Sequence, residues 1–176
     1  GEKKKTGQYK NIRPDAVSNV PSVCFTAEYH NNGGKQIMDK MNPAFIIEIN
    51  NLVGYEEVEY LRDLARALPY TYITFMGASG RSLKIICLAR CSKPSDELTA
   101  EEMEKLLIQA YSDASKYYSA QLGTSVDIKI PTLQSACKVS ADPQIYFNPA
   151  AEEFFVNDRE RKAPVHQRRI LTKDDT

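Results

Sequence analysis

The sequence has no excess of charge of either sign. Its 176 residues include 23 Lys and Arg against 23 Asp and Glu. The average charge therefore gives no reason to expect nucleic acid, a membrane surface or an acidic partner, and any such partner must be recognised through local clusters. No apolar run approaches the roughly 18 residues of a membrane-spanning helix, and the polar first residues do not resemble a signal peptide. We therefore expect a cytoplasmic protein without a membrane segment.

Histidine and cysteine are too few, and too scattered, for the usual catalytic or zinc-binding patterns. The two histidines, His30 and His166, have no matching nucleophile, and we expect both at the surface. The four cysteines are irregularly spaced. Cys87 and Cys91 are four residues apart but lack a second pair of ligands. Buried reduced thiols are therefore a better prediction than structural zinc.

The chain is long enough for one domain with short additions. We expect that domain at residues 20–156, after a basic lead-in at 1–19 and before a polar, basic tail or linker at 157–176. The sequence begins with glycine, so we expect it to be a trimmed piece of a longer chain.

An apolar strand at 45–50 opens the central part of the chain. An amphipathic helix is expected within 51–70, because apolar residues recur there at helical spacing. Two β-rich runs follow, at 71–76 and 83–89, joined by the glycine-bearing turn at 77–82. The turn resembles a phosphate loop only loosely. A hairpin turn is the better prediction, since it joins two strands.

A second helix begins near Thr99, which forms a capping-box pattern with Glu102, and it ends near Gly123. Short strands are expected at 126–130 and 135–141. The resulting order, βαββαβ, predicts an α+β fold with a ferredoxin-like or RRM-like core and additions at both ends. The first and third strands of this core are expected at its centre.

Polar residues mark one face of this predicted sheet. Glu48 and Asn50 are two residues apart on the first strand, so they share a face. Lys84 starts the third strand, and Asp127 lies after the second helix. Carboxylates on one face can hold a divalent ion, although an amide in place of the second carboxylate lowers the ligand charge. The alternative is an open polar sheet face with one salt bridge.

Several segments in this order resemble a known family. The best matches are S-G-R-S-L-K at 79–84 and S-A-D-P-Q-I-Y-F-N-P at 140–149. Over about 20–156 the chain resembles the N-terminal domain of VirE-like (virulence-associated protein E) proteins, a branch similar to the archaeo-eukaryotic primase-polymerase superfamily. The resemblance implies an RRM-like catalytic core, two divalent metals (Mg or Mn) and nucleotidyl transfer.

The resemblance also implies roles for single residues. Glu48, Asn50 and Asp127 match the catalytic positions, with Glu48 and Asp127 as metal ligands, and Ser82 and Lys84 match the nucleotide-binding positions. 

Four positions depart from the superfamily pattern. Glu48 and Asn50 replace an aspartate pair, Ser135 replaces an arginine, and Ala141 replaces a tyrosine. These changes predict weakened or lost catalysis.

Two functions from different classes follow. The first is a primase-polymerase-like domain of a bacterial DNA replication protein from a plasmid or other mobile genetic element. Its partners would be DNA or RNA, nucleotides and a helicase-type C-terminal domain. The second is a non-catalytic nucleic-acid-binding or protein-interaction module on an RRM-like scaffold.

Overall fold

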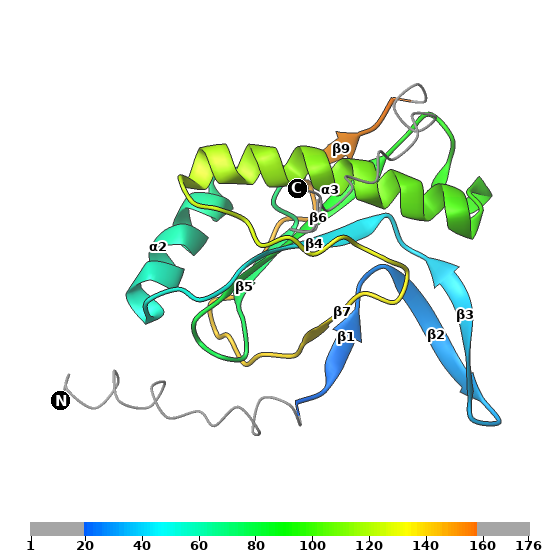
Figure 1. Cartoon of the computed structure of the whole chain (residues 1–176), viewed down its shortest axis with the longest axis horizontal. Coiled ribbons are helices and arrows are strands. Elements are labelled where there is room, and N and C mark those ends of the chain that lie inside the picture. Colours follow the sequence, from blue (N-terminus) through cyan, green and yellow to red (C-terminus); the bar gives the residue numbers. More distant parts are fainter. Residues whose placement is uncertain (1–19, 158–176) are drawn as a thin grey trace, which may run out of the picture.

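The computed structural model describes residues 20–157 and shows two α-helices on one face of a five-stranded sheet (Figure 1). The helices are α2 (Tyr55–Arg66) and α3 (Ala100–Leu122), with a short 3₁₀ turn at Ser95–Glu97 before α3. The strands of this sheet are β4 (Ala44–Ile49), β5 (Ile73–Met76), β6 (Leu83–Arg90), β8 (Tyr146–Phe147) and β9 (Glu153–Phe155). The predicted α+β class with a ferredoxin-like core is confirmed in this sense. The lead-in at 1–19 and all but Asn157 of the tail lie outside the described residues.

The order of the main sheet is β4-β6-β5-β8. Strand β9 pairs in parallel with the last residues of β6. All other pairs in this sheet are antiparallel. Strand β6 is central, as predicted. Strand β4 has β6 on one side only, so the prediction that it is central is wrong for the pairing seen here.

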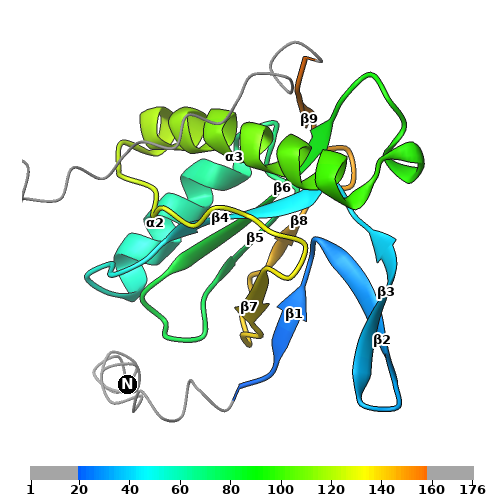
Figure 2. The same ribbon diagram turned by 45° about the vertical axis from the view of Figure 1, so that its right-hand side comes forward.

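Two smaller sheets flank the main one (Figure 2). Strands β1 (Ser22–Cys24) and β7 (Ala136–Lys138) pair with each other. Strands β2 (Ala27–Asn32) and β3 (Lys35–Met41) form a hairpin that projects from the body. Gly33 and Gly34 turn this hairpin at φ of 58° and 82°, values that favour glycine. The sequence signals the turn at 30–34, but strand β3 was not predicted, because it is almost wholly exposed.

The two helices begin and end where local chemistry directs. The Thr99 side chain accepts the Glu102 N–H, and the Glu102 side chain accepts the Thr99 N–H, so the predicted capping box is confirmed. Gly123 ends α3 in the left-handed conformation. Helix α2 ends before Pro69, and its apolar side faces the sheet.

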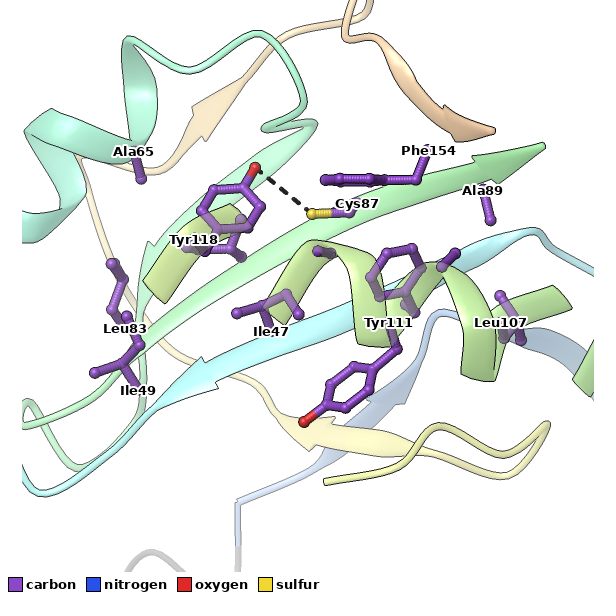
Figure 3. Packing of buried hydrophobic residues seen from close by; sticks show 14 of the residues in the cluster. Ile47, Ile49, Ala65, Leu83, Cys87, Ala89, Leu107, Tyr111, Tyr118 and Phe154 are labelled. Atoms are coloured by element: carbon purple, nitrogen blue, oxygen red, sulfur yellow. Dashed lines mark hydrogen bonds between the residues drawn. The ribbon is translucent and has the colours of Figure 1, made fainter. Parts of the chain in front are cut away.

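The main core lies between the helices and the sheet (Figure 3). Alternate residues of β4 and β6, including Ile47 and Cys87, point into it. The Cys87 thiol lies 3.6 Å from the Tyr118 hydroxyl, and burial raises the pKa of that thiol to about 12. This confirms a buried, reduced cysteine at this position.

The opposite face of the sheet is not open. Ala44, Ile46, Phe75, Ile86 and Cys137 form a second, smaller cluster there. Cys137 belongs to β7, so the β1–β7 pair covers part of this face. The polar residues of β4 and β6 lie at the edge of this cover, which leaves them only partly accessible.

The strand expected at 126–130 is absent. The Asp127 N–H donates to the Glu48 carbonyl at 2.9 Å, as a strand neighbour would. The next two backbone groups, the Asp127 carbonyl and the Lys129 N–H, bond to a side chain instead. The Tyr111 hydroxyl donates to the Asp127 carbonyl at 2.7 Å and accepts the Lys129 N–H at 2.8 Å. A side chain thus takes the partners that a ladder would need. The run at 135–141 is a strand only at 136–138, and it pairs with β1 outside the main sheet.

Candidate functional site

The residues singled out on β4 and β6 meet at one end of the sheet. The antiparallel register places Glu48 directly opposite Lys84. The Lys84 ammonium lies 3.2 Å from Glu48 Oε1, and it also donates to Asn50 Oδ1 at 3.3 Å. The Asn50 amide donates to Glu48 Oε2 at 3.4 Å. The predicted polar stripe is therefore a connected network.

A second lysine, which the sequence interpretation missed, completes the network. Lys129 Nζ lies 3.0 Å from the same oxygen, Glu48 Oε1, and it also donates to the Ala136 carbonyl at 3.4 Å. A signal for Lys129 existed: it follows Asp127 by two residues in an alternating run, so both share a face of an extended segment.

Asp127 also joins the site, through the backbone of β4. Its Oδ2 accepts the Asn50 backbone N–H at 2.6 Å. Asp127 thereby closes the end of β4, where Asn51 has a positive φ of 56°. This carboxylate fixes the backbone that carries Asn50.

The charges at Glu48 are unequal. Glu48 is 6% exposed and its Oε1 faces two ammonium groups, while the Asp127 carboxylate on the Asn50 N–H brings the formal charge of the whole cluster to zero. Burial raises the pKa of Glu48, but Lys84 and Lys129 outweigh this effect and hold the pKa below its usual range. Glu48 is therefore ionised at neutral pH. The Lys129 side chain is 45% exposed, so an approaching solute can reach it, whereas the Lys84 side chain is 13% exposed.

Ser82 lies beside this network at the end of the 77–82 turn. It is buried, and its hydroxyl packs so closely on Gly77 that a side chain at position 77 would overlap it. The same added atom would lie 3.2 Å from Lys84 Cε. Gly77 thus allows Ser82 and the Lys84 stem to pack together. All five predicted site residues lie in one region of the structure.

The donor set does not fit a divalent cation. Glu48 already bonds to two ammonium groups and an amide, and Asp127 Oδ2 accepts a backbone N–H. In residues 20–157, no group of three or more His, Cys, Asp and Glu side chains is arranged to hold a metal ion. Two ammonium groups at one carboxylate oxygen also repel a further cation there.

The D-P motif at 142–143 has a structural partner that the sequence did not reveal. Arg62 of α2 is buried, and its Nη1 donates to Asp142 Oδ2 at 2.7 Å. Its Nη2 donates to Gln144 Oε1 at 2.6 Å, and the Met76 N–H donates to Asp142 Oδ2 at 2.8 Å. This ion pair fixes the 140–145 loop against α2 and β5.

A groove of about 510 Å³ lies elsewhere, between the hairpin and the loop before β7. Its lining residues are Tyr29, Gln36, Met38, Glu104, Thr132, Leu133 and Gln134. None of them belongs to the Glu48 network. Within residues 20–157, no helix combines the length and the apolar character that crossing a membrane requires.

The fold and this network define an α+β domain with a charged cluster at one end of a mostly antiparallel sheet. The chain belongs to the family described as BT4734-like, N-terminal domain, which it matches over residues 15–147. This finding overturns the resemblance to the VirE-like N-terminal domain, which is a different family. The motifs at 79–84 and 140–149 led to that assignment. No curated protein and no solved structure matches the chain.

Proposed function

We propose that this domain is a nucleic-acid-binding module that holds phosphate groups with Lys84 and Lys129. One observation carries the proposal: both ammonium groups lie within 3.2 Å of one carboxylate oxygen, Glu48 Oε1. The protein itself thus places an anion between the two lysines. A phosphate oxygen is the external group with matching charge and hydrogen-bonding capacity.

The surroundings of the cluster favour a polymer over a small molecule. The cluster lies outside the groove near the hairpin, and Lys129 extends toward solvent. Phe147 of β8 is half exposed and contacts Tyr72 edge-to-face at 5.1 Å. An exposed ring on the same sheet as Lys84 suits single-stranded nucleic acid, because a base can stack on the ring while lysines contact phosphates.

Charge changes at the cluster test the proposal. We expect Lys84→Met and Lys129→Met each to weaken binding of a labelled single-stranded oligonucleotide about tenfold, the size of one charged hydrogen bond. Glu48→Gln removes the competing internal anion, and we expect it to tighten binding. Fluorescence anisotropy at low salt measures all three. Lys105→Met, at an exposed i,i+4 pair with Glu101 on α3, is the matched control and should bind as the wild type does.

The direction of the Glu48→Gln effect is decisive. A metal-dependent site loses function with this change, whereas a lysine-based anion site gains affinity. Equal weakening by Lys105→Met would indicate non-specific charge attraction. If the wild type does not bind the oligonucleotide even at low salt, nucleic-acid binding is wrong.

We also expect no nucleotidyl transfer, or very weak transfer. With Mn²⁺, a primed template and nucleotides, extension products should be absent, because Glu48 is already paired with two lysines. Asn50→Asp, which restores a second carboxylate, should not create extension. The measurement is a gel assay with an active polymerase as the positive control. Robust extension that disappears in Glu48→Ala would show instead that a catalytic primase-polymerase-like activity is retained.

The protein-interaction alternative has an observation of its own. The projecting hairpin exposes Ile37 and Met38, and Met38 lines the 510 Å³ groove. This surface would be left intact by changes at Lys84 and Lys129. The helicase-type partner domain has no counterpart within residues 20–157, and it stays a prediction.

A further inference from the structure

Tyr111 reaches from helix α3 toward the charged cluster. Its ring is buried and contacts Phe45 of β4 edge-to-face, with centroids 6.4 Å apart. Figure 3 shows its hydroxyl pointing away from the Tyr118 and Cys87 pair in the core. Tyr111 thus has a fixed ring and a hydroxyl aimed at a different part of the molecule.

That hydroxyl holds the backbone on both sides of one residue. It donates to the Asp127 carbonyl at 2.7 Å and accepts the Lys129 N–H at 2.8 Å. The residue between them, Ile128, is 92% exposed, so its side chain does not anchor the segment. The backbone of this stretch also bonds to β4, where the Asp127 N–H donates to the Glu48 carbonyl. The tyrosine hydroxyl is therefore a main support of the backbone that carries Lys129.

We propose that Tyr111 is a positioning residue of the anion-binding cluster, which holds Lys129 on Glu48 through the backbone of residues 127–129. The expected effect of Tyr111 on oligonucleotide binding rests on the proposed function, whereas its effect on the Lys129–Glu48 contact does not. Tyr111 itself touches neither Glu48 nor a ligand phosphate. Its role is to make one of the two lysines available at a fixed place.

Tyr111→Phe isolates this role. The phenylalanine ring keeps the contact with Phe45, while the Asp127 carbonyl and the Lys129 N–H lose their shared partner. Water can satisfy both groups because the segment is exposed. The expected result is a folded domain in which Lys129 no longer stays at Glu48.

The first measurement needs no ligand. Carboxyl ¹³C shifts followed against pH give the pKa of Glu48 in the wild type, Tyr111→Phe, Lys129→Met and the double variant. The groups that face Glu48 are Lys84 from β6, Lys129 and Asn50, with the Cys137 thiol of β7 close by. We expect the pKa of Glu48 to rise in both single variants. The double variant should match Lys129→Met alone.

The second measurement is oligonucleotide affinity. Tyr111→Phe should weaken binding by a factor close to that of Lys129→Met, and the two changes should not add. A plot of the logarithm of affinity against the logarithm of salt concentration should also be less steep than that of the wild type. The slope should change by about 0.7, the value for one lost phosphate contact to a single strand.

Tyr118→Phe is the control for a merely structural effect. It removes a buried hydroxyl on the same helix, which bonds to Thr71 and Cys87 in the core. It should leave both the pKa of Glu48 and the salt slope unchanged. The inference is wrong if Tyr111→Phe leaves the pKa of Glu48 as in the wild type, or if its effect adds to that of Lys129→Met. Absence of binding by the wild type would instead contradict the proposed function, while the pKa comparison would still decide the role of Tyr111.

Discussion

Replacing Asp142 by asparagine should destabilise the domain by about 3 kcal/mol or more, the cost of breaking a buried ion pair on one side. The Arg62 side chain is 1% exposed, and its Nε has no hydrogen-bond partner in the structure. Without the Asp142 carboxylate, that buried charge would keep only the longer ion-pair contact of its Nη2 with Glu59 Oε1, at 3.6 Å on the same helix. Arg62→Met should cost less, because it removes the charge and keeps an unbranched chain. Urea denaturation followed by circular dichroism measures the free energy of unfolding of each variant.

Asp63→Asn is the matched control for Asp142→Asn. Asp63 lies next to Arg62 on α2 and pairs with Arg66 at 3.7 Å, but its side chain is 69% exposed. We expect a change within about 0.5 kcal/mol, as for surface ion pairs. If the two asparagine variants lose equal stability, the Arg62–Asp142 pair does not hold the loop as described.

The same pair makes stability sensitive to acid. Burial raises the pKa of Asp142, but the Met76 and Gln144 N–H groups and Arg62 outweigh it and hold the pKa below its usual range. A lowered carboxyl pKa contributes stability above the usual pKa, and this contribution is lost as pH falls below about 4. The decrease in the free energy of unfolding on acidification should be smaller in Asp142→Asn than in the wild type.

Replacing Phe154 by alanine should cost about 3–5 kcal/mol of the free energy of unfolding, the usual range for a buried phenylalanine. The ring stacks on Tyr70 at 4.3 Å and contacts Phe45 at 6.1 Å, so it joins β9 to the centre of the core. Phe154 lies beyond residue 147, where the family match ends. A large loss would show that the domain needs this strand. Thermal or urea unfolding is the measurement.

The next residue provides the control. Phe155 is half exposed, and its ring contacts the Arg90 guanidinium at 5.2 Å on the other side of the strand. Phe155→Ala should cost at most about 1 kcal/mol, as for an exposed cation–π contact. A small effect at Phe154 as well would mean that residues 153–155 do not complete the core.

The sequence predicted the helices and the strands β4, β5 and β6 because local signals agree there. Helix α3 has a capping box at its start and glycine at its end, and both act within a few residues of chain. Strands β4 and β6 are apolar runs, and alternation along β4 placed Glu48 and Asn50 on one face, while the pairing register that sets Lys84 opposite Glu48 came from the structure. Such signals do not depend on what packs against them.

The segment at 126–130 shows why the last strand was wrong. Its alternating residues fit a strand as well as any other run in the chain. Tyr111, fifteen or more residues earlier, decides otherwise by bonding to Asp127 and Lys129. A competing side chain from a helix cannot be seen in a local pattern.

By itself, the sequence determined the α+β class, the ends of α3 and the shared face of Glu48 and Asn50, because these follow from propensity, capping and alternation. Only the tertiary structure decided that Lys129 shares Glu48 with Lys84, and that Asp142 pairs with Arg62. Both contacts join residues about 80 positions apart in the chain. Long-range contacts depend on how the elements pack, and our proposal of an anion site follows from one of them, the contact between Lys129 and Glu48.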